Sequence, residues 1–174
     1  MKWNVAQLLR SPTGTDCRYA FDDEGRQLGG LASGITGSVR LIRTNKGILA
    51  LARGQASAEC TCSRCLDRFE YPARFDIAEE FWPSVDVEDG SRVDEASDAV
   101  FTIDERHILD LSKLVAQDIL ADLPMKPLCA EDCPGICATC GAQLRFRPCE
   151  CPAGGSDSRW DKLAGIRLEI GGAP

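Results

Sequence analysis

The chain has 174 residues, of which 44% are hydrophobic and 27% charged, and its formal net charge at pH 7 is −7. A chain of this length suits one domain and buries about two-thirds of its unfolded surface without needing disulfides. A protein that binds nucleic acid through general electrostatic attraction usually carries a basic footprint, so the acidic balance argues against that class for the chain as a whole.

The first part of the chain predicts short strands separated by turns. A strand is expected near Trp3 and Val5. The features that follow before residue 35 are a turn over residues 11–15, a strand from Cys17 to Phe21 and a glycine-containing loop over residues 29–34. None of these segments is long enough to establish the fold by itself.

A β-hairpin is predicted next. Apolar and polar residues alternate from Ile35 to Leu41, a period typical of a half-buried strand. The turn Thr44–Gly47 follows, and Gly47 is able to adopt a positive φ there. A second strand then runs from Ile48 to Glu59, so the two strands predict an antiparallel hairpin.

The most regular alternation runs from Phe69 to Ile77, with apolar residues at odd positions and mostly charged residues at even ones. This pattern predicts a strand that packs on one face and meets water on the other. Phe81 and Trp82 extend the strand up to Pro83. The acidic stretch from residue 86 to residue 105, with eight carboxylates and one arginine, predicts a mobile loop.

One main helix is predicted after the acidic stretch. Asp110 is placed to cap it through its carboxylate, and Pro124 ends it. The apolar residues that recur at helical spacing between these two are Leu111, Leu114, Val115 and Ile119, with Leu120 and Leu123 widening the stripe. A helix of this length covers one face of a small sheet.

Together these segments predict an α+β fold with three regions. Residues 1–128 form an antiparallel β-sheet, open or barrel-like, packed with one main α-helix. Residues 129–155 form a small Cys-rich, zinc-binding lobe, and residues 156–174 form a tail with a short helix from Ser158 to Ala164.

The compartment expected from the sequence is the cytoplasm. The opening sequence MKWNVAQLLR lacks the apolar segment of a secretory signal, and the longest apolar run, Ile48 to Ala52, is too short to span a bilayer. We therefore expect a reducing environment, where thiols stay free or bind metal, and no membrane partner. The alternative is a secreted disulfide scaffold, but such proteins are usually shorter and carry a leader.

Ten cysteines are the main chemical signal, and six of them lie between residues 129 and 151. Cys137 and Cys140 form a Cys-x-x-Cys turn that is followed by Gly141, which allows the backbone to turn tightly. Cys149 and Cys151 share one face of an extended segment, so their sulfur atoms can also converge. These four predict a closed structural zinc site; free thiols or a degenerate metal site are the alternative.

A second quartet is predicted from Cys62, Cys65, Cys129 and Cys133. The first pair lies between two predicted strands and the second pair follows the helix, so one ion would attach the lobe to the sheet. The three-residue spacing of Cys129 and Cys133 is less typical of zinc sites, and Cys60 is an alternative ligand. A structural ion in either quartet would hold together a lobe that has little core of its own.

The other candidate residues carry weaker signals. Cys17 is expected to be a buried, inert thiol, and His107 an exposed residue before the helix. The chain contains no Gly-rich phosphate loop and no nucleophile elbow, and its carboxylates do not form an obvious catalytic pair. Two basic groups are candidates for contact with nucleic-acid phosphates, with a solvated surface as the alternative for both: Arg40, Arg43 and Lys46 at the hairpin tip, and Arg145 and Arg147 in the lobe.

Several motifs, taken in order, resemble the YceD family of large ribosomal RNA subunit accumulation proteins. They are the opening MKWNVAQLL, Cys62-Ser-Arg-Cys65-Leu66, the strand from Phe69 to Ile77, Leu123-Pro-Met-Lys-Pro-Leu-Cys129, Asp132-Cys-Pro-Gly-Ile-Cys137, Cys140-Gly141 and Pro148-Cys-Glu-Cys151. The resemblance extends from the first residues to about Arg159. It implies a bacterial cytoplasmic factor that supports synthesis, processing or accumulation of large-subunit (23S) ribosomal RNA, and it implies no catalytic residues.

The leading hypothesis is therefore a non-enzymatic ribosome biogenesis factor with structural zinc. Its expected partners are ribosomal RNA, large-subunit assembly intermediates and ribosomal proteins, and no small-molecule substrate is expected. One alternative is a zinc-ribbon regulator that binds nucleic acid, which the overall acidity disfavours. Another is a thiol redox protein that uses Cys62/Cys65 or Cys137/Cys140, although such pairs usually lie at a helix start.

Overall fold

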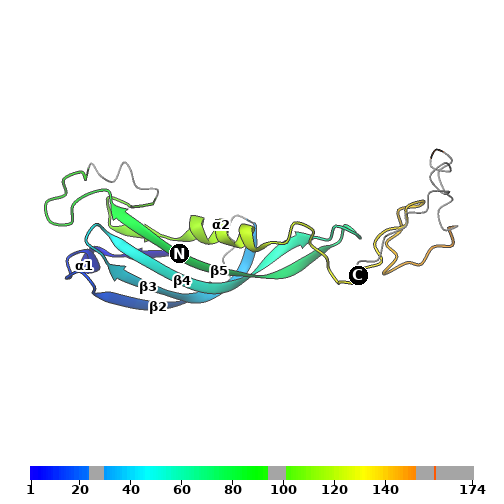
Figure 1. The fold of residues 1–174 in the computed structure, drawn as a ribbon, viewed down its shortest axis with the longest axis horizontal. Coiled ribbons are helices and arrows are strands. Elements are labelled where there is room, and N and C mark those ends of the chain that lie inside the picture. Colours follow the sequence, from blue (N-terminus) through cyan, green and yellow to red (C-terminus); the bar gives the residue numbers. More distant parts are fainter. Residues whose placement is uncertain (24–29, 94–100, 152–158, 160–174) are drawn as a thin grey trace, which may run out of the picture.

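The computed structural model describes residues 1–23, 30–93, 101–151 and 159. The helix predicted from Ser158 to Ala164 lies outside the described residues, apart from Arg159. In chain order the elements are β1 (Lys2–Asn4), α1 (Ala6–Leu9), β2 (Asp16–Asp23), β3 (Ala32–Arg43), β4 (Ile48–Thr61), β5 (Arg68–Pro83), β6 (Thr102–Ile103), β7 (Ile108–Asp110) and α2 (Ser112–Asp122) (Figure 1). The described part of the chain is mostly sheet with two helices, in agreement with the predicted α+β class.

The main sheet has five strands in the order β2-β3-β4-β5-β6, and β1 and β7 form a separate two-stranded ribbon. Strands β2 to β5 are antiparallel neighbours, which confirms the predicted hairpin of β3 and β4. Strand β6, which the sequence did not predict, pairs in parallel with the end of β5 at Trp82 and Pro83, so the sheet is mixed.

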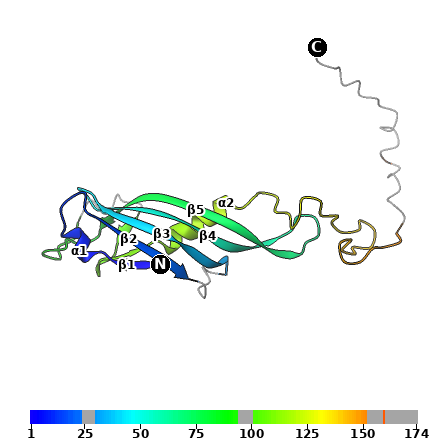
Figure 2. The same cartoon turned by 90° about the horizontal axis from the view of Figure 1, so that it is seen from below.

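The barrel-like form of the prediction is wrong, because β2 and β6 lie at opposite edges of the sheet and do not pair. Strand β6 has only two residues and covers one end of the 16-residue β5. Much of the outer edge of β5 therefore has no partner strand. Helix α2 lies alongside this strand instead, and the long β4–β5 hairpin projects past the other strands toward the Cys-rich segment (Figures 1 and 2).

The core lies on one face of the sheet. Ala73, Phe75 and Ile77 are buried on β5 while the even positions between them are exposed, which confirms the alternation predicted for this strand. Gly37 and Gly54 face each other on β3 and β4, and the rings of Phe21 and Phe75 stack beside them with centroids 6.3 Å apart. A Cβ at Gly54 would lie 2.4 Å from the Phe75 ring, so the glycines make room for these aromatic side chains.

Gly47 does not use the positive φ that the turn signal allowed. A Cβ there would lie 2.0 Å from the carbonyl oxygen of Phe81. Glycine is needed at this turn because the backbone of β5 approaches closely. The loop predicted over residues 29–34 also differs, since Ser33 and Gly34 belong to β3. Gly34 has a φ of 58° at a register shift between Ser33 and Thr36, which is how β3 accommodates a β-bulge.

Helix α2 begins one residue later than the predicted start at Leu111. The N-cap residue is Leu111, which has no side-chain capping bond, but the Oδ1 atom of Asp110 one residue earlier accepts a hydrogen bond of 2.9 Å from the backbone N–H of Ser112. Leu114, Val115 and Ile119 are buried, while Leu120 is 54% exposed. The apolar stripe of the helix is therefore narrower than the sequence suggested.

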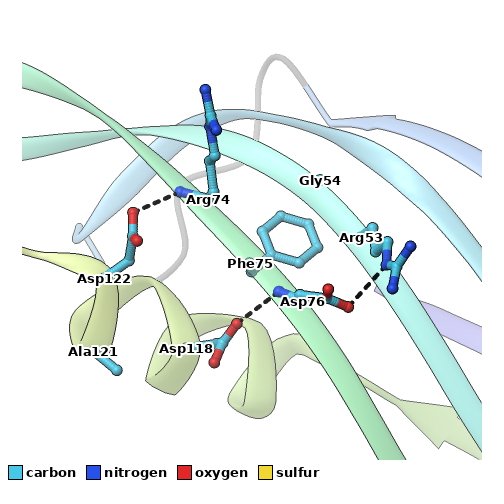
Figure 3. A pocket seen from close by; sticks show the side chains of 8 residues that line it. All are labelled: Arg53, Gly54, Arg74, Phe75, Asp76, Asp118, Ala121 and Asp122. Carbon is cyan, nitrogen blue, oxygen red and sulfur yellow. Dashed lines mark hydrogen bonds and ion pairs between the residues drawn. The ribbon is translucent and has the colours of Figure 1, made fainter.

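Two aspartates of α2 accept hydrogen bonds from backbone N–H groups on the free edge of β5. The Oδ2 atom of Asp122 accepts from the backbone N–H of Arg74 at 2.9 Å, and the Oδ2 atom of Asp118 accepts from that of Asp76 at 2.8 Å (Figure 3). Pro72, also in β5, has no N–H to satisfy. Unpaired N–H groups on an edge strand invite pairing with other chains, so these contacts protect the edge and hold the helix in register with the strand.

The acidic stretch, predicted to be a loop, is partly regular in its described residues. Asp86 accepts hydrogen bonds from the backbone N–H groups of Glu88 and Asp89, and Val85 and Arg92 form an isolated antiparallel bridge. After residues 94–100, which lie outside the described residues, Phe101 and Ile103 provide the carbonyls that bond to β5 and its extension. This stretch therefore also completes one end of the sheet.

Replacing both aspartates, Asp118→Ala with Asp122→Ala, is expected to lower the free energy of unfolding by about 2 kcal/mol, since each exposed hydrogen bond contributes about 1 kcal/mol. Urea unfolding with saturating zinc measures the change. The Asn variants at both positions keep an acceptor oxygen and are expected to lose less. A double Ala variant as stable as the parent protein would contradict a role for these carboxylates at the edge.

Candidate metal centres

The first centre gathers four sulfur atoms from segments far apart in the sequence. Cys62 and Cys65 lie in the turn at the tip of the β4–β5 hairpin, and Cys129 and Cys133 follow α2. All four Sγ atoms lie within 4.8 Å of one another. The Sγ atoms of Cys62 and Cys133 are 3.8 Å apart, and those of Cys65 and Cys129 are 3.7 Å apart.

These distances fit a tetrahedral ion and do not fit a disulfide. A Zn–S bond of about 2.3 Å places the sulfur atoms of a regular tetrahedron about 3.8 Å apart. A disulfide would require about 2.0 Å, and all four cysteines are free. Cys62, Cys65 and Cys133 are at most 4% exposed, so the centre is part of a buried cluster that also contacts Phe69 and Leu128. Cys60, the alternative ligand, is buried on β4 outside this group.

The surroundings of the first centre shift the pKa values of Cys62 and Cys129 in opposite directions. Hydrogen bonds from the backbone N–H groups of Cys129 and Cys65 lower the pKa of Cys62 to about 6. Burial and the adjacent thiols raise the pKa of Cys129 to about 12. A cation at the centre of the four would favour the thiolate form of Cys129, which is how metal binding displaces protons.

The second centre is built within a short segment. The Sγ atoms of Cys137, Cys140, Cys149 and Cys151 also lie within 4.8 Å of one another. These residues are half-buried or exposed, so this centre is closer to the surface than the first. Backbone N–H groups of Cys140 and Thr139 lower the pKa of Cys137 to about 6. Hydrogen bonding to Cys140 and burial raise the pKa of Cys151 to about 12.

The two Cys-x-x-Cys turns have the same backbone hydrogen bonds. In the first, the N–H of Cys62 donates to the carbonyl of Asp67 at 2.8 Å, and the N–H of Leu66 donates to the carbonyl of Cys62 at 3.0 Å. In the second, the N–H of Cys137 donates to the carbonyl of Ala142 at 2.8 Å, and that of Gly141 to the carbonyl of Cys137 at 2.9 Å. Each turn therefore presents two sulfur atoms on one side.

The turns differ at the residue after the second cysteine, which has a positive φ in both. Gly141 has a φ of 72°, which costs a glycine little. Leu66 has a φ of 60°, a conformation that costs a side chain with a Cβ about 1–2 kcal/mol, and it remains 62% exposed. The leucine therefore gains little from burial at a position that glycine would occupy without strain.

The four sulfur atoms of each group can hold one metal ion, and all eight donors are cysteine sulfur. Thiolates of this kind select zinc and other soft or borderline ions over magnesium or calcium. Within the described residues, these are the two groups of three or more candidate ligands whose atoms lie within 4.8 Å of one another. The sequence had separated the same eight cysteines into the same two groups.

Residues of the second centre's loop also contact the first centre. The Nε2 atom of Gln143 donates to the carbonyl oxygen of Cys65 at 3.1 Å, and the Nη1 atom of Arg145 donates to the Sγ atom of Cys129 at 3.6 Å. Arg145 was nominated as a phosphate contact, but its guanidinium faces a candidate metal ligand. Arg147 is exposed, as is the neighbouring Phe146, which is 64% exposed.

The three cations predicted at the tip of the β3–β4 hairpin do not form one cluster. Arg43 donates to the carbonyls of Leu9, Thr44 and Gly47, so its guanidinium holds the β3–β4 turn. The Nζ atom of Lys46 lies 4.5 Å from the centre of a Trp82 ring. Arg40 bonds to Asp16 at 2.8 Å and thereby lowers the pKa of that carboxyl.

The sequence reasoning missed the arginines that share a face with Arg40. Strand register places Arg18, Arg40 and Arg53 on the solvent side of three adjacent strands, with Arg74 on β5. A cleft of about 540 Å³ beside α2 is lined by Arg53, Arg74 and Asp76 together with Asp118 and Asp122 (Figure 3). The alternation of each strand would have been the signal, had the strands been aligned, because the solvent face takes even positions on β2, β3 and β5 and odd positions on β4.

The remaining predicted side chains lie apart from both centres. Cys17, expected to be buried, is half-buried against the main core. His107, expected to be exposed, is half-buried with a φ of 58°, and its Nδ1 atom is buried without a hydrogen-bond partner in the described structure. Among the helices that the structure describes, none has the length and apolar character needed to cross a membrane.

Comparison with known proteins identifies a family match over most of the chain. The model of the family described as "Large ribosomal RNA subunit accumulation protein YceD" matches residues 52–167, which include both cysteine quartets. Uncharacterized proteins of Mycobacterium tuberculosis and Mycobacterium bovis are 29% identical over 126 residues, which cover 72% of this chain and 58% of theirs. An uncharacterized protein of Mycobacterium leprae is 38% identical over 55 residues, 32% of this chain and 25% of that protein.

The chain therefore spans little more than half the length of the mycobacterial relatives. No solved structure gives a significant match.

Leu66→Gly is expected to raise the free energy of unfolding of the zinc-loaded protein by about 1 kcal/mol, because it removes the strain of a positive φ. Leu66→Ala is the matched control, since it shortens the side chain but keeps the Cβ that causes the strain. Chemical denaturation measures both variants. An equal gain in the two variants would assign the effect to the exposed side chain instead of to the backbone.

The metal-free protein is expected to be alkylated faster by iodoacetamide at Cys137 than at Cys151 at pH 7. Both are half-buried, but a pKa of about 6 makes Cys137 mostly thiolate at this pH, whereas a pKa of about 12 keeps Cys151 protonated. The rate at Cys137 should fall as the pH drops through 6. Site-resolved mass spectrometry measures the rates, and equal labelling of the two cysteines would contradict the assignment.

Proposed function

We propose that this chain, which belongs to the YceD family, is a non-enzymatic ribosome biogenesis factor. It supports synthesis, processing or accumulation of large-subunit (23S) ribosomal RNA in the bacterial cytoplasm. Its partners are ribosomal RNA or large-subunit assembly intermediates and ribosomal proteins, with no membrane and no small-molecule substrate. The observation that carries the proposal is the family match over residues 52–167.

Structural zinc is the proposed metal at both quartets. Sulfur-to-sulfur distances of 3.7 and 3.8 Å at the first centre match the edge of a zinc tetrathiolate. At the second centre, the turn around Cys137 and Cys140 has the same backbone hydrogen bonds as the first. Each ion would be closed to solvent by four protein ligands, and the chemistry it supplies is structural: it fixes the positions of the segments that carry the sulfur atoms.

A redox role for the cysteine pairs is the less favoured reading. Cys62 and Cys65 are at most 1% exposed, and each lies against further thiols of its quartet. A redox dithiol requires one accessible thiolate at which exchange can begin. Burial of the first pair and the four-sulfur arrangement of the second therefore support metal binding.

The proposed regions are a sheet-and-helix core over residues 1–128 and a Cys-rich lobe over residues 129–155, with the tail beyond. The first quartet takes two ligands from the core and two from the lobe. Its ion would therefore attach the lobe to the tip of the β4–β5 hairpin. The lobe would then act as a rigid contact surface. Its exposed Phe146 and Arg147 are suited to stacking on an unpaired base and pairing with a phosphate.

Arg40 and Lys46 are proposed as further phosphate contacts, although their contacts to Asp16 and Trp82 would have to yield to RNA. Arg43 and Arg145 remain candidates from the sequence, with the reservation that both guanidinium groups already donate within the protein. The exposed Phe146 and Arg147 also suit the alternative, a zinc-ribbon nucleic-acid regulator. Steeply salt-dependent binding to duplex DNA, stronger than binding to single-stranded RNA, would favour that alternative.

The test combines metal content with association in the cell. Protein purified without added metal is expected to contain two zinc ions per chain by elemental analysis, and Cys137→Ser with Cys140→Ser should leave one; Cys17→Ser is the control and should leave two. Tagged protein from its native bacterium should co-sediment with large-subunit precursors, and its depletion should lower the ratio of 23S to 16S ribosomal RNA. Absence from these particles together with an unchanged ratio would overturn the proposed function.

A further inference from the structure

The two metal centres are in direct contact through the loop of the second. Residues 141–148 lie between the two ligand pairs of the second centre. From this loop, Arg145 reaches the Sγ atom of Cys129 and Gln143 reaches the carbonyl of Cys65, both in the first centre. The loop is therefore fixed at its ends by one group of sulfur atoms and touches the other group in its middle.

The backbone between the centres is also held. The N–H of Leu144 donates to the carbonyl of Gly135 at 3.0 Å, and Ile136 and Gln143 form an antiparallel bridge. A Cβ at Gly135 would lie 3.2 Å from the carbonyl oxygen of Arg64 in the first Cys-x-x-Cys turn. The loop, residues 135 and 136, and the tip of the β4–β5 hairpin are thus in contact. Gln143 takes part in two of these contacts.

The charge of a filled centre explains why an arginine lies there. Four thiolates around one divalent ion carry a net charge of about −2. A guanidinium that donates to a coordinated thiolate offsets part of this charge, and contacts of this kind around a metal change its affinity by about 10- to 100-fold when they are removed. Within the described residues, Arg145 is the side-chain cation for which the structure gives a contact to a cysteine sulfur.

We infer that the two centres bind metal cooperatively, with Arg145 and Gln143 as the positioning residues that couple them. An ion at the second centre fixes both ends of the loop and so holds Arg145 against Cys129. Coupling of binding free energies is reciprocal, so an ion at the first centre favours loading of the second by the same factor. This inference rests on the proposal that both quartets hold zinc, and it adds a regulation of their occupancy.

The experiment is a double-mutant cycle on zinc affinity. Metal-free protein is titrated with Zn²⁺ in competition with a chromophoric chelator of known affinity, and the affinity of the first centre is measured in four forms: the parent chain, Arg145→Ala, Cys140→Ser with Cys149→Ser, and all three changes together. Removing either Arg145 or the second centre is expected to weaken the first centre about tenfold. The two effects should not add, because each breaks the same coupling.

Arg147→Ala is the matched control, since it removes an exposed cation from the same loop that has no contact to a sulfur atom in the described structure. It should leave the affinity of the first centre unchanged. Arg145→Lys keeps the charge but loses the planar donor group, and is expected to recover part of the affinity. Equal effects of Arg145→Ala and Arg147→Ala, or additive effects within the cycle, would overturn the inference.

A second measurement covers the case in which the double Cys→Ser chain does not fold. Zinc release to excess chelator is followed in the parent chain and in Arg145→Ala with Gln143→Ala, both of which keep all eight cysteines. We expect one release phase for both ions in the parent chain and two separate phases in the variant. Two independent phases in both chains would overturn coupling, whereas a parent chain that binds fewer than two ions would instead overturn the proposed zinc content.

Discussion

Convergence of four sulfur atoms at the tip of the β4–β5 hairpin is the constraint on which the rest of this structure depends. Cys62 and Cys65 arrive from the sheet, and Cys129 and Cys133 arrive from the chain after α2. The polar face of a two-stranded hairpin tip has little apolar surface to hold a second segment. The cysteines pack with Phe69 and Leu128 into an apolar cluster, and this cluster joins the hairpin tip to the segment after α2. An ion inside it would act as a cross-link between residues about 65 positions apart in the chain.

The position of α2 determines whether the second pair of cysteines reaches the first. Asp118 and Asp122 bond to the backbone of β5, so the helix runs in register with the strand that leads from the turn of Cys62 and Cys65. Leu123 is extended and ends the helix, and the chain then reaches the tip of the β4–β5 hairpin, where the N–H of Ser63 donates to the carbonyl of Pro127 at 2.8 Å. Cys129 follows two residues later. Edge protection and metal-site assembly therefore depend on the same helix register.

Local patterns in the sequence were sufficient for the strand from Phe69 to Ile77, whose period of two lies within a short window. Each cysteine quartet contains a local Cys-x-x-Cys turn, but joining Cys62 and Cys65 to Cys129 and Cys133 also required matching two pairs that lie far apart in the chain. The parallel pairing of β6 with β5 was not predictable in this way, because two residues carry no period. The role of Gly47 was also missed: its close neighbour is Phe81, on another strand, and only the folded register brings them together.

The basic residues show the same division between local and non-local information. Arg40, Arg43 and Lys46 are near one another in sequence, and that proximity suggested one phosphate site. Alternation sends Arg40 to the solvent face with Arg18 and Arg53, whereas Arg43 turns inward to three carbonyls. Sequence neighbours on a strand end on different faces, and partners on one face come from different strands.

The two centres differ in their burial and in the segments that they bring together. The first is mostly buried and brings the β4–β5 turn together with the chain after α2, while the second is half-buried or exposed and brackets residues 141–148. Yet the strained residue, Leu66, is at the buried centre, and it keeps its side chain in solvent beside the well-held turn. Strain persists where the surrounding structure over-determines the backbone. A turn cross-linked by a metal ion would meet that condition, so an ion at the first centre would hold an exposed leucine in a fixed position where an unsupported turn would relax.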